Sequence, residues 1–109
     1  MVKNKKTSPD AAIPEDFGPP VKHSFQKGQL VRSLAGRDKD KYYLVLGRAK
    51  NLLYLADGRK RGAQDPKKKN ILHVQRCNRI AADAVAAAQG RPLRDEEIRA
   101  ALRELLADE

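Results

Sequence analysis

Two short apolar runs, separated by a glycine and a charged turn, constrain the fold of this chain more than any other feature. Leu30–Leu34 is the first run, Gly36 and a charged turn follow it, and Tyr42–Leu46 is the second run. Runs of aliphatic, β-branched and aromatic residues bounded by glycine and charged turns are typical of strands. The pattern therefore predicts an antiparallel pair of short strands joined by an exposed basic loop.

Three further strands are predicted downstream of this pair. Leu52–Ala56 is the third, and the Asp57-Gly58 step after it is the strongest short-range signal for a hairpin turn. We expect a fourth strand to begin near Arg59 and to end at Asp65-Pro66, because proline cannot donate to a strand ladder. Ile71–Gln75 is the predicted fifth strand. Five short strands in about fifty residues favour a small antiparallel barrel and a mostly β chain.

The two ends of the chain differ from this middle part. Residues 1–20 hold four of the six prolines and lack periodicity, so we expect a disordered arm there. Residues 21–76 form the predicted barrel, and residues 77–109 form a helical extension. Within that extension the alanine-rich segment Cys77–Gln89 and the segment Arg94–Ala107 are predicted helices.

The last predicted helix carries an apolar stripe. Ile98, Leu102, Leu105 and Leu106 recur at helical spacing, together with Ala101. Such a stripe is expected to dock on another surface, either the barrel of the same chain or a protein partner. Self-association through the stripe is a third possibility, and the sequence does not choose among them.

Positive charge is concentrated in the middle of the chain. The sequence has a net charge of +9 and a pI near 9.9. Residues 21–79 contain 16 Lys and Arg against four acids, whereas residues 80–109 contain four Arg against seven acids. A basic surplus can simply keep a surface soluble, but a surplus located in predicted turns and strand ends favours binding of a polyanion.

Three basic clusters fall in predicted turns or at predicted strand ends. Loops on one side of a small barrel can bring such clusters onto one face, where phosphates are bound with release of counterions. The alternative is three separate solvated turns. The candidate RNA-binding residues are Arg37, Lys39 and Lys41, then Arg59, Lys60 and Arg61, then Lys67, Lys68, Lys69 and Asn70, and finally His73.

Other chemistries have little support in the sequence. Tyr42 and Tyr43 lie on opposite faces of their predicted strand, so one of them could stack on an unpaired base or cover a barrel end. His73 and Cys77 are potential metal ligands, but His23 is the only other histidine and is distant in sequence, so we expect no metal and no cofactor.

Catalysis and membrane insertion are not expected either. The chain has no glycine-rich phosphate loop and no nucleophile with a neighbouring histidine and acid, so we expect it not to be an enzyme. A single cysteine fits a reducing compartment. No apolar run of transmembrane length and no signal peptide is evident, which predicts a cytoplasmic protein.

Residues 27–74 resemble the KOW-domain RNA-binding proteins. The segment is similar to the small bacterial KOW proteins and to an archaeal-eukaryotic group of large-subunit ribosomal proteins. Asp40 departs from the pattern, because many KOW loops carry a second glycine there. The residues that carry the likeness are Gly28, Val31, Ala35-Gly36-Arg37-Asp38-Lys39, Tyr43-Leu44-Val45-Leu46, Ala56-Asp57-Gly58, Pro66-Lys67-Lys68-Lys69-Asn70 and His73.

The resemblance implies an SH3-like barrel that binds ribosomal RNA of the large subunit through its loops. Arg37 and Lys39 match the loop that contacts RNA in such domains, and Lys67–Asn70 match the family's basic segment. Our leading hypothesis is a non-catalytic, ribosome-associated RNA-binding protein, either a ribosomal protein or an accessory factor of translation. The alternative is a protein-interaction module of a transcription or translation complex that works through the C-terminal helix.

Overall fold

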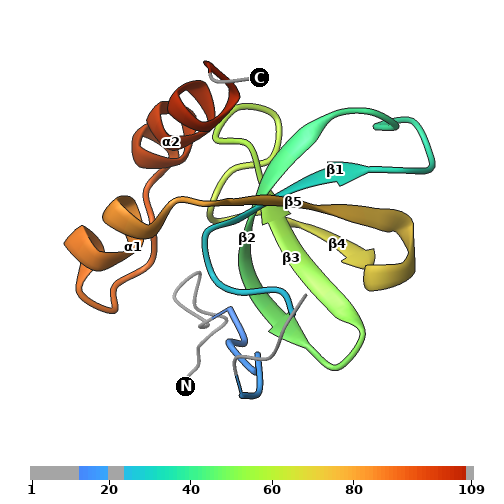
Figure 1. The fold of residues 1–109 in the computed structure, drawn as a ribbon, viewed down its shortest axis with the longest axis horizontal. Coiled ribbons are helices and arrows are strands. Elements are labelled where there is room, and N and C mark those ends of the chain that lie inside the picture. Colours follow the sequence, from blue (N-terminus) through green and yellow to red (C-terminus); the bar gives the residue numbers. More distant parts are fainter. Residues whose placement is uncertain (1–12, 20–23, 108–109) are drawn as a thin grey trace, which may run out of the picture.

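The computed structural model describes residues 13–19 and 24–107, whose arrangement is shown in Figure 1. In this part of the chain five strands form one antiparallel sheet in the order β4-β3-β2-β1-β5. This order, with a short 3₁₀ helix between the last two strands, confirms the predicted mostly β, barrel-like fold with C-terminal helices. The elements are β1 (Gln29–Ser33), β2 (Tyr42–Ala49), β3 (Leu52–Ala56), β4 (Lys67–Asn70), the 3₁₀ helix η2 (Ile71–His73), β5 (Val74–Ile80), α1 (Ala82–Ala88) and α2 (Asp95–Ala107).

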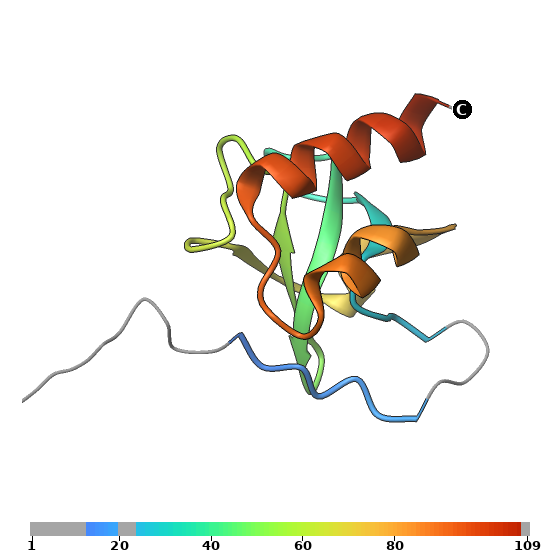
Figure 2. The same cartoon turned by 90° about the vertical axis from the view of Figure 1, so that its left-hand side faces the viewer.

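Both faces of the sheet are buried, and each face packs into its own hydrophobic core. On one face of the sheet, Val31 and Val45 pack with other apolar side chains. On the opposite face, Leu30 and Leu44 pack with Ile98 of α2. Figure 2 shows the two helices lying over this face. Because successive side chains of a strand point to opposite faces, β1 and β2 contribute to both cores.

The stripe of α2 docks on the sheet of its own chain. Ile98 is completely buried and Leu102 is 8% exposed, while Leu105 and Leu106 are half-buried against the same cluster. Ile98 and Leu102 therefore pack on the sheet of the same chain, which is one of the alternatives that the sequence left open for this stripe. Neither described helix has the length and apolar character that a membrane-spanning helix needs.

Residues 13–19 correct the prediction of a disordered arm over residues 1–20. The carbonyl oxygen of Pro14 accepts a hydrogen bond from the backbone nitrogen of Arg48 at 2.7 Å, at the end of β2. A Cβ atom at Gly47 would collide with Pro14, so glycine allows this close approach. The segment is thus part of the fold, and the rest of the predicted arm lies outside the described residues.

The fourth strand lies later in the chain than predicted. The stretch between Arg59 and Asp65 belongs to a loop, residues 57–66, and β4 consists of Lys67–Asn70 instead. The predicted fifth strand starts with η2, and its extended part begins at Val74. Pro66 ends the loop rather than the strand, because the lysine-rich residues that follow it pair with β3.

β5 is longer than predicted and extends into the alanine-rich segment. It ends at Ile80, so the predicted boundary between residues 76 and 77 falls inside this strand, and α1 begins at Ala82. The side-chain amide nitrogen of Gln29 donates to the carbonyl oxygens of Cys77 and Arg79, the latter at 3.0 Å. Gln29 is itself completely buried, so its side chain holds these residues extended against β1.

Candidate nucleic-acid interface

Loops 34–41 and 57–66 both lie in the upper half of Figure 1, the first on the right and the second on the left, beside α2. The first loop joins β1 to β2, and the second joins β3 to β4. Leu44, near the start of β2, lies opposite Ala56 at the end of β3, and Leu55 lies opposite Lys67 at the start of β4. The first two predicted basic clusters therefore lie at one end of the sheet, and the third begins there.

The loop between β1 and β2 is held by Asp38, which is only 6% exposed. One carboxylate oxygen, Oδ1, accepts hydrogen bonds from Ser33 Oγ at 2.9 Å and from Lys69 Nζ at 2.8 Å. The other, Oδ2, accepts from the Tyr43 hydroxyl at 3.3 Å and lies 3.4 Å from Lys67 Nζ. A buried carboxylate thus ties the first loop to β2 and β4.

The Asp38 carboxylate is ionised, and the two lysines of the same network neutralise its charge. Burial by itself raises the pKa of Asp38, but the hydrogen bonds from Lys69 and Ser33 and the charges of Lys67 and Lys69 outweigh burial and lower this pKa to about 2. Burial and the negative charge of Asp38 raise the pKa of Tyr43 to about 12. Near neutral pH the carboxylate is therefore charged and the phenol is neutral.

The third predicted cluster is divided between the inside and the outside of the fold. The side chains of Lys67 and Lys69 are 27% and 10% exposed and both point to Asp38. Lys68 lies on the other face of β4, is exposed, and places its Nζ atom 5.7 Å from the centre of the Tyr54 ring. The side chain of Asn70 caps η2. Only Lys68 of this cluster therefore presents its charge to solvent without a carboxylate partner among the described residues.

The side chains of the first predicted cluster are exposed to solvent. Arg37, Lys39 and Lys41 are exposed, and no carboxylate within residues 13–19 and 24–107 lies within ion-pair distance of them. The nearby acid Asp40 is paired with Arg32 at 3.2 Å. Asp40 has a φ of 71°, the left-handed conformation that glycine favours, so the loop keeps a geometry compatible with glycine at this position.

The second predicted cluster projects from a turn that is closed by an aspartate. Asp57 Oδ1 accepts hydrogen bonds from the backbone nitrogens of Arg59 at 2.8 Å and Arg61 at 3.0 Å. Arg61 also forms an ion pair with Asp65 at 3.5 Å. Arg59 and Lys60 are exposed, and the part of the chain that the structure describes offers them no carboxylate partner.

Helix α2 holds this second loop from the side. Asp95 Oδ1 accepts a hydrogen bond from the backbone nitrogen of Ala63 at 2.6 Å, and the guanidinium of Arg99 donates to the carbonyl oxygen of Gly58 at 2.5 Å. The first turn of α2 is acidic, and Glu97 pairs with Arg91 at 2.6 Å. The hydrogen bond from Arg91, followed by that from the backbone nitrogen of Arg94, lowers the pKa of Glu97 to about 2.

His73, Leu72 and Lys50 lie in or beside η2, and of these only His73 was a predicted site residue. His73 is exposed and belongs to η2 rather than to the predicted strand. Leu72, beside it, is 80% exposed. Lys50 is exposed in the turn between β2 and β3, where the neighbouring Asn51 accepts a hydrogen bond from Ile71 of η2. The signal that could have indicated a turn was Asn70, a residue that favours caps.

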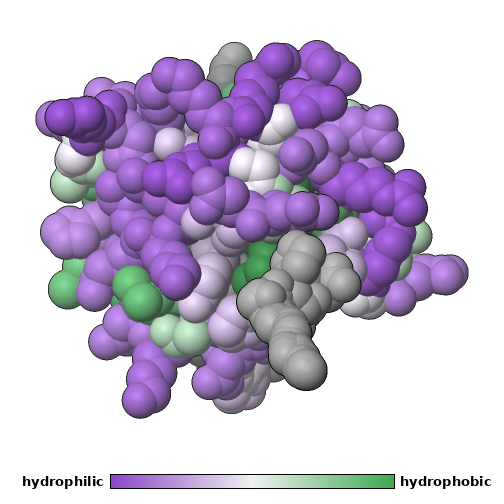
Figure 3. Space-filling view, turned by 180° about the vertical axis from the view of Figure 1, so that it is seen from behind, coloured by the Kyte–Doolittle hydropathy of each residue, from purple (hydrophilic) through white to green (hydrophobic). Residues whose placement is uncertain are grey.

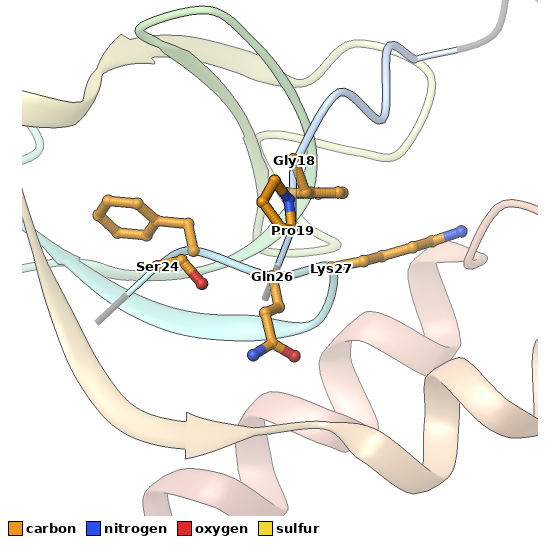
Figure 4. Close-up of a pocket in the computed structure, with 7 residues that line it drawn as sticks. Gly18, Pro19, Ser24, Gln26 and Lys27 are labelled. Atoms are coloured by element: carbon orange, nitrogen blue, oxygen red, sulfur yellow. The ribbon is translucent and has the colours of Figure 1, made fainter. Parts of the chain in front are cut away.

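Two hollows in the surface of the described residues differ in size and in charge. The recess in Figure 4, lined by residues such as Ser24 and Lys27, has a volume of about 220 Å³. Ligand pockets are usually about 300–1,000 Å³. A second hollow of about 430 Å³ between α1 and α2 is bordered by Asp83, Glu97 and Glu104, whose charges repel phosphate.

No protein-family model matches this chain, and no curated protein matches it either. Among the described residues, no group of three or more His, Cys, Asp or Glu side chains is arranged to hold a metal ion. The arrangement that stands out is electrostatic, with unpaired cations on the loops at one end of the sheet and an acidic first turn on α2.

Proposed function

We propose that this protein is a non-catalytic RNA-binding protein that contacts the phosphate backbone of folded RNA through loops 34–41 and 57–66. The observation that carries the proposal is the pairing of charges around these loops. Asp38, Asp40 and Asp65 are each neutralised by a lysine or arginine of the same region. These acids therefore do not pair with the exposed cations of the region. The exposed cations are Arg37, Lys39, Lys41, Arg59, Lys60 and Lys68.

Ribosomal RNA of the large subunit, in the cytoplasm, is the proposed target. Support for it comes from the resemblance of residues 27–74 to KOW-domain proteins and from the exposed cations of the two basic loops. Phosphate contacts without a recognition helix suit folded RNA, whose shape and backbone are read rather than its sequence. A partner-binding C-terminal helix is not proposed, because Ile98 and Leu102 are buried against the sheet.

The electrostatic character of binding can be tested by its salt dependence. About four or five phosphate contacts should lower the affinity for RNA by roughly two orders of magnitude between about 50 and about 200 mM salt. We expect the double variant Arg37→Glu/Lys39→Glu to bind a fluorescent RNA hairpin at least about tenfold more weakly and with a shallower salt slope. Fluorescence anisotropy at several salt concentrations measures both quantities.

The matched control is Arg94→Glu/Arg103→Glu, which changes the net charge by the same amount at exposed positions in and beside α2. We expect this control to bind RNA within about twofold of the wild type. Equal losses in the two variants would show that only net charge matters, and unchanged binding of the loop variant would refute the assigned interface. Salt-sensitive co-sedimentation with large ribosomal subunits tests the proposed target separately.

A further inference from the structure

Leu72 is an exposed apolar side chain beside the proposed RNA-binding surface. It is 80% exposed, compared with 39% for Leu34 and 40% for Leu52, which are the other exposed large apolar residues described. Both of these flank η2, because Leu34 is hydrogen-bonded to His73 and Leu52 lies opposite Asn70. Figure 3 shows hydrophobic surface at its lower left, on the side of the molecule where η2 lies in Figure 1.

Hydrogen bonds hold the backbone of each of the three residues of η2. The backbone nitrogen of Ile71 donates to the carbonyl oxygen of Asn51 at 2.9 Å, and that of Leu72 donates to Asn70 Oδ1 at 2.8 Å. The carbonyl oxygen of His73 accepts from the nitrogen of Leu34 at 2.8 Å. The side chain is therefore presented to solvent from a rigid support, which lowers the entropy lost when it makes a contact.

The surroundings of this leucine are cationic. Lys69 Nζ donates to the carbonyl oxygen of Ala35 at 2.7 Å, which places β4 and η2 directly beside the loop that carries Arg37 and Lys39. His73 of η2 is exposed, and so is Lys50, next to the residue Asn51 that is hydrogen-bonded to η2. An apolar side chain in a positively charged setting is complementary to a ligand that has both phosphates and flat apolar faces, as an unpaired nucleotide does.

We propose that Leu72 packs against an unpaired base of the bound RNA, so that the preferred RNA is a helical stem with a bulged or looped nucleotide beside it. This inference rests on the proposed function. The bases of a continuous stem are stacked, and its major groove is too deep and narrow for side chains, so a leucine reaches a base only where pairing is interrupted. A protein partner fits less well, since a specific interface covers about 800 Å² per partner and three leucines among polar residues supply little of that.

The test compares two RNA hairpins that differ only in one unpaired nucleotide in the stem. We expect the wild-type protein to bind the bulged hairpin about five- to tenfold more tightly than the fully paired one, from burial of apolar area of Leu72. Leu72→Ala should abolish this preference while leaving affinity for the paired hairpin and the salt slope unchanged. Leu72→Met, which keeps an apolar side chain, should retain the preference. Circular dichroism checks that both variants are folded, as expected for a residue that is 80% exposed.

Each outcome bears on a different proposal. Equal wild-type affinity for the two hairpins, or a preference that survives in Leu72→Ala, overturns the role of Leu72 and leaves the proposed RNA binding intact. Failure of the wild type to bind either hairpin at low salt overturns the proposed function itself. Sedimentation equilibrium without RNA tests whether Leu72 instead binds a second copy of the chain. Self-association of the wild type that Leu72→Ala removes would overturn the role in RNA binding and assign this side chain to a dimer contact.

Discussion

The two basic loops leave the same end of the sheet but are held in place by different means. Loop 34–41 is held by its own buried aspartate, Asp38, which accepts hydrogen bonds from Ser33 and Lys69. Loop 57–66 is held by backbone hydrogen bonds to Asp57 and by contacts from α2, among them the one to Asp95. One loop therefore depends on buried charge, and the other depends on the docking of a helix.

This difference shows that a basic turn in a sequence does not define the role of its charges. Lys67 and Lys69 look like Lys68 in the sequence, yet the register of β4 turns the first two toward a buried carboxylate and the third toward solvent. Neutralisation of Asp38 by inward lysines leaves the cations of its loop available. Position in the sheet, rather than local composition, separates structural lysines from candidate RNA contacts.

Removal of the charge that holds the first loop should have the largest effect on stability. We expect Asp38→Asn to lower the free energy of unfolding by about 3 kcal/mol, because it leaves Lys67 and Lys69 without their buried partner. Urea unfolding followed by circular dichroism measures the change. Asp40→Asn in the same loop is the control, and its exposed pair with Arg32 should contribute less than about 1 kcal/mol. Equal effects would show that burial of Asp38 is unimportant.

The second loop should be destabilised by an added methyl group at Gly58 rather than by the loss of a charge. Gly58 has a φ of 79°, and a Cβ atom there would lie 2.5 Å from the carbonyl oxygen of Asp95 in α2. Gly58→Ala is expected to destabilise the protein by about 2–3 kcal/mol, from backbone strain together with displacement of α2. Gly36→Ala in the first loop, with a φ of 85° and nearest atoms at 3.5 Å, should cost only about 1 kcal/mol. Thermal unfolding of the two variants compares them, and similar losses would contradict the contact between this loop and α2.

Acid should weaken the first loop selectively. The folded pKa of Asp38 is lowered from 3.8 to about 2, so its stabilisation is present above about pH 4 and is lost as the pH falls toward 2. The difference in free energy of unfolding between wild type and Asp38→Asn should shrink by roughly 2 kcal/mol over this interval. Glu97, whose pKa is also low, is present in both proteins and cancels in the comparison. A difference that is independent of pH would contradict the low pKa of Asp38.

Much of the sheet could be predicted from local pattern, because its central strands are apolar and their turns contain glycine. Leu52–Ala56 was predicted to the residue as β3, and Tyr42–Leu46 forms most of β2. The apolar stripe of α2 was also evident, although its docking partner was not. These elements share a strong periodicity that burial on one or both faces requires.

The misplaced elements depend on contacts that are distant in sequence. Lys67–Asn70 has a poor intrinsic preference for strands, and it is extended because it pairs with β3 and reaches Asp38. Gln29 holds Cys77 and Arg79 in β5 across the sheet, although the following alanines favour a helix. The candidate site was predicted at loop 34–41, where charge and glycine coincide, whereas Leu72 carries no local signal.

The lysines of β4 have one more consequence, which concerns the behaviour of the protein at high concentration. β4 is an edge strand of the sheet, and among the described strands it pairs with β3 alone. Edge strands are templates on which another chain can add a strand and start aggregation, and charged side chains discourage this. Lys67 and Lys69 are paired with Asp38, so a second copy that approached β4 edge to edge would bring its own Lys68 against the exposed Lys68 of the first. The exposed charge of Lys68 thus discourages the addition of a strand from a second copy at this edge of the sheet.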